Sequence, residues 1–197
     1  LRRWNDFWTG DRNLLEKTPI HVRFLDDIKR LFLHARIIGI TRDPLDTVAS
    51  LAKRHDEQLG RAISRYNRDS LLLRRAVRKR QLCIVLRYED IIHDPEASFV
   101  SLQKALGLKI IRDLHLSKGD KVSWYSRGSL TSTLGRHETP HTDKRERQIN
   151  RPIFDGRGSF KKQLTDAQIK TVIRATWENA RQFGYGDSPE NRVVQCL

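Results

Sequence analysis

Residues 35–46 read ARIIGITRDPLD, an apolar run that passes directly into a charged turn. The run at 35–41 is short and rich in β-branched residues, which predicts a buried strand of a parallel sheet rather than an alternating edge strand. After it, Asp43 can cap a helix, and Pro44 suits the first helical position. The stretch therefore predicts a strand that leads straight into a helix, as in an α/β protein.

The flanking sequence extends this pattern in both directions. Residues 22–32 carry apolar side chains at helical spacing, and residues 61–80 are typical of a further, basic helix. A second apolar run at 82–86 follows, so strand, helices and strand predict a crossover between two parallel strands. Two more helices are expected, one capped by Asp94 and one that begins with a capping box at 165–168.

Composition sets the expected size and the class of partner. With 197 residues, 38% of them hydrophobic, the chain can bury one ordinary core, which predicts a single domain over 1–197. Residues 117–159 lack periodicity, and we expect a long irregular loop there, within that domain. The formal charge of +14 favours anionic partners but does not choose among nucleotides, acidic glycans, nucleic acids and anionic membranes.

Residue usage also bears on location and completeness. No apolar run approaches the roughly 20 residues of a membrane-spanning helix. The two cysteines, Cys83 and Cys196, form no recognisable disulfide framework, which predicts a reducing, cytoplasmic location. The sequence has no methionine, position 1 included, so we expect an N-terminally incomplete piece of a longer chain.

Arg42 is the first candidate ligand for an anion. It follows a predicted strand and precedes a helix, and open α/β sheets bind ligands beyond the carboxyl ends of their strands. Its guanidinium could make two bonds to a phosphate, and Ser50 could add a hydroxyl if the helix lies along the ligand. The alternative is that Arg42 pairs with Asp46 and that Ser50 only packs against the helix.

Three blocks of the sequence resemble, in order, the sulfotransferases that use 3′-phosphoadenosine 5′-phosphosulfate (PAPS). The first spans 35–50, the second holds the Tyr-Glu-Asp motif at 88–90, and the third spans 154–165. The resemblance implies a three-layer α/β sandwich with a parallel sheet, similar to the P-loop nucleoside triphosphate hydrolases. It also implies that PAPS is the donor, that no metal is required, and that the acceptor is a hydroxyl or an amine of a glycan, a protein tyrosine or a small molecule.

The same resemblance assigns roles to individual residues. Arg42 and Ser50 match the pair that holds the 3′-phosphate of the donor, and Tyr88 would pack on its adenine. The third block supplies a phosphate loop with three candidate ligands: Arg157, Gly158 and Ser159. The family's arginine-lysine-glycine signature is not reproduced in this block. We expect the family's 5′-phosphosulfate loop to lie ahead of residue 1, because nothing in the sequence corresponds to it.

Three residues near the start of the chain are candidates for the chemistry of transfer. Lys17 lies where the family places a lysine that contacts the transferring group, and such a cation would stabilise the charge there. The alternative for Lys17 is a solvated side chain before a turn. The resemblance does not supply the base for the acceptor, and the local candidates are Glu16 and His21.

Two other patterns point to different functions. Residues 137–141 read HETPH and satisfy the H-E-x-x-H zinc pattern, but Pro140 interrupts the helix that this pattern needs, so no zinc site is expected. The arginines of 61–80 could instead form a stripe that contacts nucleic acid or another polyanion. Tyr66 is the one aromatic residue of that stretch, so nucleic acid is not expected as the partner. Nucleotide binding without catalysis is a third alternative.

Overall fold

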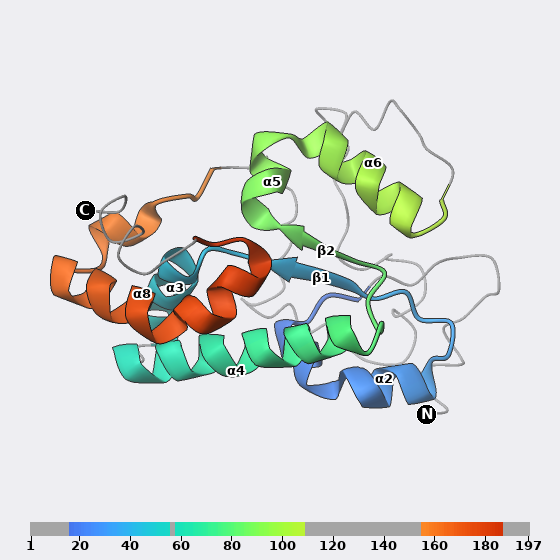
Figure 1. Cartoon of the computed structure of the whole chain (residues 1–197), viewed down its shortest axis with the longest axis horizontal. Coiled ribbons are helices and arrows are strands. Elements are labelled where there is room, and N and C mark those ends of the chain that lie inside the picture. Colours follow the sequence, from blue (N-terminus) through green and yellow to red (C-terminus); the bar gives the residue numbers. More distant parts are fainter. Residues whose placement is uncertain (1–15, 56–57, 109–154, 187–197) are drawn as a thin grey trace, which may run out of the picture. The chain divides into compact units, whose positions relative to one another are not determined.

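The computed structural model describes residues 16–55, 58–108 and 155–186 (Figure 1). The chain divides into two compact units, Leu1–Thr18 with Asp113–Phe154, and Pro19–Arg112 with Asp155–Leu197. Only residues 16–18 of the first unit are described, and every described helix and strand belongs to the second unit. The single domain expected over 1–197 therefore stays a prediction.

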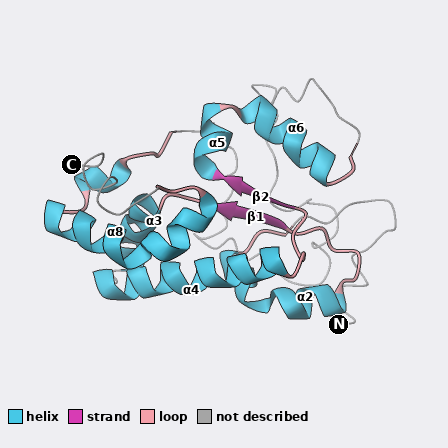
Figure 2. Ribbon diagram, in the orientation of Figure 1, coloured by secondary structure: helices cyan, strands magenta, loops and turns pink. Residues whose placement is uncertain are grey.

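A small parallel sheet links the helices of the second unit. Strand β1 (Ile38–Thr41) pairs in parallel with β2 (Ile84–Arg87), and both arrows point the same way in Figure 2. The connection between them contains two helices, α3 (Pro44–His55) and α4 (Leu59–Arg78). The predicted crossover between parallel strands is thus confirmed, whereas the three-layer sandwich stays a prediction because the described residues form two strands.

The two faces of β1 differ in exposure. Gly39 and Thr41 are buried, and a Cβ atom added to Gly39 would lie 3.0 Å from the side chain of Leu73 on α4. Ile40 points to the other face, because side chains alternate along a strand, and it is 61% exposed. The prediction of a buried strand is therefore wrong for Ile40: within the described part of the chain, α4 packs on the Gly39 side.

Helix α8 (Asp166–Ala180) completes a core with α3 and α4. The three helices pack side by side (Figure 1). Leu45 and Val48 of α3 and Val172 of α8 are 0% exposed. They belong to a cluster that also contains Ala49, Ala62, Ile63, Tyr66, Phe160, Ile169 and Ile173. Burial of one such aliphatic side chain contributes about 1.5–3 kcal/mol, so this cluster fixes the late helix α8 against the early helix α3.

Local signals set the helix ends as the sequence predicts. Asp43 Oδ1 accepts a hydrogen bond of 2.8 Å from a backbone N–H in the first turn of α3. Asp94 accepts a similar bond from the first turn of α6 (Pro95–Ala105). Thr165 and Gln168 form both bonds of the capping box at the start of α8. These three predictions are confirmed.

The remaining described elements are short: η1 (Pro19–Phe24), α2 (Leu25–Leu31), α5 (Tyr88–His93), η2 (Ser159–Lys162) and η3 (Arg181–Phe183). The helix predicted over 22–32 is thus divided into η1 and α2, and Tyr88 begins α5 directly after β2.

No helix within the described residues is long and apolar enough to cross a membrane. Cys83 is an exposed free thiol, and Cys196 lies outside the described residues.

Candidate functional site

Three segments that are distant in sequence meet beyond the carboxyl end of β1. The residue after β1 is Arg42, the start of α5 supplies Tyr88, and the loop before η2 supplies residues 155–158. Hydrogen bonds and a ring contact join all three segments within the second unit. The three blocks on which the family resemblance rests are therefore brought together in space.

Arg42 lies between the loop and the ring of Tyr88. Its Nη2 donates a hydrogen bond of 2.5 Å to the carbonyl of Gly156, and its guanidinium carbon lies 4.6 Å from the centroid of the Tyr88 ring. The Tyr88 hydroxyl in turn accepts a hydrogen bond of 3.2 Å from the N–H of Gly156. A cation–π contact contributes about 0.5–2 kcal/mol, so Arg42, Tyr88 and Gly156 hold one another in place.

Asp46, in the first turn of α3, joins the loop to that helix. Its Oδ1 accepts hydrogen bonds from the hydroxyl of Ser159 at 2.9 Å and from the N–H of Phe160 at 3.0 Å. Its Oδ2 accepts a bond of 2.9 Å from the N–H of Gly158, whose φ of 71° lies in the region that favours glycine. Asp46 is 1% exposed, and a carboxylate at such a depth is stable only with donors of this kind.

An ion pair between Arg42 and Asp46 was the alternative to a ligand role for Arg42. This ion pair is present, but the distance between its charged atoms is long. Arg42 Nη2 lies 3.5 Å from Asp46 Oδ2, whereas charge-assisted bonds of this type measure about 2.7–2.9 Å. The loop already gives Asp46 three donors, so the carboxylate does not depend on Arg42 alone. Arg42 Nε is buried and has no hydrogen-bond partner among the described residues. The guanidinium therefore keeps donor capacity for a ligand.

Glu89 connects the end of β2 with α3 and with the segment after η3. Its Oε1 accepts a hydrogen bond of 2.9 Å from the N–H of Asp43, and its Oε2 accepts one of 2.7 Å from the hydroxyl of Tyr185. Burial, together with the bond to Glu89, raises the pKa of the Tyr185 hydroxyl above its usual value. Arg87 stacks on the Tyr185 ring, 4.6 Å from its centroid. Glu89 and Tyr185 therefore connect the segments next to the site, a role that the sequence did not predict.

Arg157 is paired with its near neighbour Asp155. Arg157 Nη2 lies 2.7 Å from Asp155 Oδ2, and Arg157 Nε bonds both carboxylate oxygens, at 2.9 and 3.0 Å. These hydrogen bonds lower the pKa of Asp155 to about 2 and raise the pKa of Arg157. To bind a phosphate, Arg157 would have to exchange this carboxylate for an oxygen of the ligand.

The other predicted site residues lie on separate segments. Ser50 is half-buried on α3, one turn after Asp46. His21 lies in η1, whose main contacts are with α2 and α4. Glu16 and Lys17 are exposed and belong to the first unit. The catalytic roles assigned to His21, Glu16 and Lys17 stay predictions.

The described residues contain no group of His, Cys, Asp or Glu side chains that could hold a metal ion. The H-E-x-x-H stretch at 137–141 and most of the loop predicted over 117–159 lie outside the described residues. The groups gathered around Arg42 include the hydroxyl of Tyr88 and the carboxylate of Asp46, which lies 3.5 Å from the guanidinium. Of these groups, the guanidinium of Arg42 is the one that favours an anion.

A comparison with protein-family models gives this geometry its context. The model described as the sulfotransferase family matches residues 3–113, more than half of the chain. The chain belongs to the sulfotransferase family. The matched residues include Arg42, Asp46, Tyr88 and Glu89, whereas the loop before η2 lies beyond the match. Comparisons with curated proteins and with solved structures gave no match.

Proposed function

We propose that the chain binds the 3′-phosphoadenosine end of PAPS at Arg42 and transfers the sulfuryl group to a hydroxyl or amine acceptor. The observation that carries this proposal is the guanidinium of Arg42, whose side chain is 29% exposed and whose buried Nε has no partner among the described residues. The planar fork of an arginine fits the oxygens of a phosphate. The bound nucleotide would supply an activated sulfuryl group.

The neighbours of Arg42 suit a nucleotide in different ways. We assign Ser50 to the 3′-phosphate as well. Ser50 lies on α3, the helix that begins two residues after Arg42, so both residues follow the carboxyl end of β1. We assign Tyr88 to the adenine, because aromatic rings stack on one another and this ring is only half-buried. The N–H of Gly158 and the hydroxyl of Ser159 already bond Asp46, so we assign these residues to positioning the loop.

Transfer requires a cation near the oxygens of the moving group and a base for the acceptor. We assign the first role to Lys17, and the base to Glu16 or His21. As the acceptor oxygen or nitrogen forms its bond to sulfur, the bond between sulfur and the 5′-phosphate oxygen of PAPS breaks and 3′-phosphoadenosine 5′-phosphate leaves. The proton of the acceptor passes to that base. A preorganised donor at such a centre lowers the barrier by about 2.7–4 kcal/mol. No metal is assigned to the site, and the acceptor is a glycan, a protein tyrosine or a small molecule.

Calorimetry with two nucleotides tests the assignment of Arg42. We expect Arg42→Ala to weaken binding of 3′-phosphoadenosine 5′-phosphate by about 1.5–3 kcal/mol, because one charged contact to the 3′-phosphate is lost. Binding of adenosine 5′-phosphate, which lacks that phosphate, should change little. Arg36→Ala is a matched control, because Arg36 is an exposed arginine just before β1, at its other end.

Equal losses for the two nucleotides would contradict the assignment of Arg42 to the 3′-phosphate. Thermal unfolding of each variant separates a loss of affinity from a loss of structure, since Arg42 also contacts Gly156 and Tyr88. Radiolabelled sulfate transfer is measured on the same samples. Tight nucleotide binding without transfer would favour the alternative of a binding protein without catalysis.

A further inference from the structure

The peptide that follows Arg42 is held by a side chain rather than by the sheet. Its N–H group, which belongs to Asp43, donates a hydrogen bond of 2.9 Å to Glu89 Oε1. Strands β1 and β2 pair in parallel as far as Thr41 and Arg87, and the second chain segment then turns into α5. The backbone of β2 therefore does not continue as a strand beside this peptide, and the carboxylate of Glu89 supplies the acceptor that the N–H group needs.

The same peptide is also held at its carbonyl oxygen. Thr47 Oγ1 donates a long hydrogen bond of 3.4 Å to the carbonyl of Arg42. The N–H group of Thr47 donates a bond of 2.9 Å to the next carbonyl, that of Asp43. A peptide group is planar and moves as a unit. With Glu89 on its N–H group and Thr47 on its oxygen, the peptide between Arg42 and Asp43 therefore has a fixed orientation.

The second oxygen of Glu89 is held by Tyr185. This tyrosine is 2% exposed, and its hydroxyl donates a hydrogen bond of 2.7 Å to Glu89 Oε2. Burial raises the pKa of the hydroxyl, so this donor keeps its proton at physiological pH. The preceding residue, Gly184, has a φ of 78° and turns the chain after η3. The bonds from Asp43 and Tyr185 together leave the carboxylate of Glu89 little freedom to rotate.

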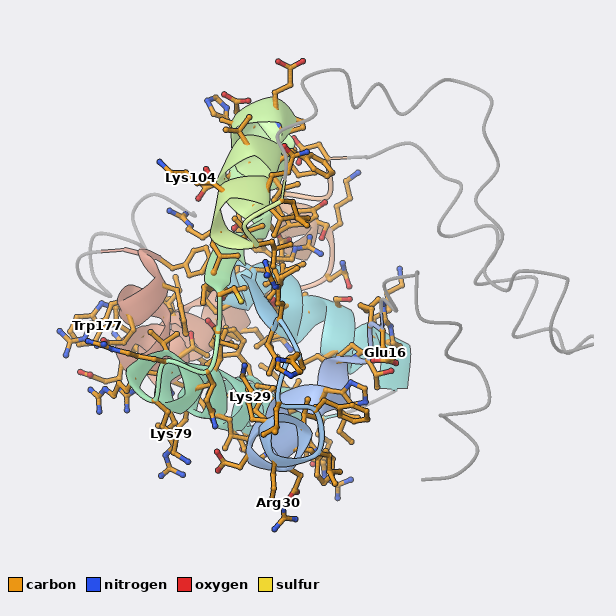
Figure 3. All side chains as sticks on the ribbon, turned by 90° about the vertical axis from the view of Figure 1, so that its right-hand side faces the viewer. Glu16, Lys29, Arg30, Lys79, Lys104 and Trp177 are labelled. Atoms are coloured by element: carbon orange, nitrogen blue, oxygen red, sulfur yellow. The ribbon has the colours of Figure 1, made fainter. Side chains whose placement is uncertain are left out.

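Carboxylates on a different part of the surface make other contacts. Asp26 lies 2.7 Å from Lys79, and Asp27 lies 3.0 Å from Arg30. Figure 3 shows Lys79 and Arg30 extending outward from their helices. Exposed pairs of this kind join flexible side chains and contribute little to the structure. Glu89 instead bonds a backbone N–H group and a buried hydroxyl, so it fixes the course of the main chain.

We propose that Glu89 is a positioning residue of the donor site, which directs the guanidinium of Arg42 toward the 3′-phosphate. A binding group must be held within roughly 0.5 Å of its productive position, and a long side chain magnifies any rotation of the backbone from which it starts. The far end of Arg42 contacts Tyr88 and Gly156, and Glu89 fixes its near end through the following peptide. This inference rests on the proposed function, from which it takes the assignment of Arg42 to the donor.

Glu89 acts through its bonds and not as a ligand, because a carboxylate repels a phosphate. Two substitutions separate the bonds from the charge. In Glu89→Gln, the amide oxygen can accept the bond from Asp43, and the amide nitrogen can donate to the hydroxyl of Tyr185, which is also an acceptor. Glu89→Gln thus removes the charge and keeps both connections, whereas Glu89→Ala removes both connections.

Calorimetry with 3′-phosphoadenosine 5′-phosphate and adenosine 5′-phosphate measures the selectivity for the 3′-phosphate as the ratio of the two affinities. We expect Glu89→Ala to lower this ratio about three- to tenfold, and Glu89→Gln to keep it within about twofold. Asp69→Ala is the matched control, because Asp69 is also a half-buried carboxylate and joins η1 to α4 through a bond of 3.1 Å from Arg23. This control should lower stability without changing the ratio.

A measurement without nucleotide keeps this proposal apart from the proposed function. NMR of the free protein follows the side-chain Nε–H signal of Arg42 and the hydrogen exchange of the Asp43 amide. We expect the Arg42 signal to move and the Asp43 amide to exchange faster in Glu89→Ala, and both to stay near their native values in Glu89→Gln. An unchanged Arg42 signal in Glu89→Ala would overturn the proposal, as would an equal loss of the ratio in Glu89→Ala and Asp69→Ala.

A double variant, Arg42→Ala with Glu89→Ala, tests whether Glu89 acts through Arg42. Its ratio should equal that of Arg42→Ala alone, because the group that Glu89 positions is absent, and a further loss would overturn the proposal. If Arg42→Ala itself leaves the ratio unchanged, the proposed function fails, and the NMR signal of Arg42 then decides whether Glu89 positions that side chain. If Glu89→Ala does not fold, Tyr185→Phe takes its place, because it removes one of the two bonds to Glu89. An unchanged Arg42 signal in that variant would equally contradict the proposal.

Discussion

Replacing Asp46 by Asn keeps the size of the side chain but turns one of its two acceptor oxygens into a donor. In the native protein, Oδ1 accepts bonds from Ser159 and Phe160, and Oδ2 accepts a bond from Gly158. Whichever oxygen is replaced, a backbone N–H of the loop then faces an amide N–H. This happens at a side chain that is 1% exposed, where water does not readily substitute for the lost acceptor.

The size of the effect follows from these bonds. A buried donor left without an acceptor costs about 1–3 kcal/mol, and the remaining bonds weaken because a neutral oxygen replaces a charged one. We therefore expect Asp46→Asn to lower the free energy of unfolding by about 2–4 kcal/mol. That is a large part of the roughly 5–15 kcal/mol that stabilises a typical domain, yet the protein should still fold.

Urea denaturation of Asp46→Asn and Asp43→Asn measures this loss against a matched control. Both substitutions remove one negative charge from the start of α3, but Asn caps a helix about as well as Asp, so Asp43→Asn should cost less than about 0.5 kcal/mol. Hydrogen exchange gives a local reading. The amides of Gly158 and Phe160 should exchange about 5- to 150-fold faster in Asp46→Asn. Equal losses of stability in the two variants, with unchanged exchange at these amides, would refute the role of Asp46 as the anchor of the loop.

Two further substitutions test the contacts around the site. In Asp155→Asn, Arg157 loses its charged partner. If Arg157 reaches a phosphate, calorimetry should then show that 3′-phosphoadenosine 5′-phosphate binds about two- to fivefold tighter. Unchanged affinity would mean that Arg157 does not belong to the donor site. The pKa of Asp155 in the folded protein is about 2, below its usual value of 3.8. The pair with Arg157 therefore stabilises the protein above about pH 4, and this stabilisation is lost as the pH falls through 2. An NMR titration of Asp155 would follow the loss. In Tyr185→Phe, Glu89 loses one of its two donors, and urea denaturation should show a loss of about 1–3 kcal/mol; a loss near zero would mean that water replaces the hydroxyl.

Features set by neighbouring residues could be predicted from the sequence. Asp43, Asp94 and the capping box at Thr165 act within one turn of their helices, so their partners are fixed by spacing alone. The parallel pairing of the two strands also followed, because the chain between them is long and helical. The exposure of Ile40 could not be predicted in this way. An apolar run indicates that a strand is suited to burial, but it does not indicate which face of the strand other elements will cover.

The site itself could be predicted only in part, because its contacts join residues far apart in sequence. Arg42 and Tyr88 were predicted as site residues, and the structure places them in contact. Asp46 was considered only as a possible partner of Arg42, and nothing in the sequence connects it with Gly158. Glu89 gave a signal only as part of the motif at 88–90, and its partner Tyr185 gave none. Such pairings depend on how α3, α5 and α8 pack.

The bonds from Asp46 to the loop also have a consequence for the order of folding. Their donors lie 112 to 114 residues later in the chain. Closing a flexible loop of that length costs roughly 4 kcal/mol of chain entropy, which offsets most of what these bonds contribute. The core cluster that contains Leu45 and Val48 of α3 and Val172 and Ile173 of α8 closes nearly the same loop and contributes further free energy. We therefore expect the anchoring of the loop to form late in folding, after α8 has docked on α3, so that slow refolding and recovery of nucleotide binding share one rate.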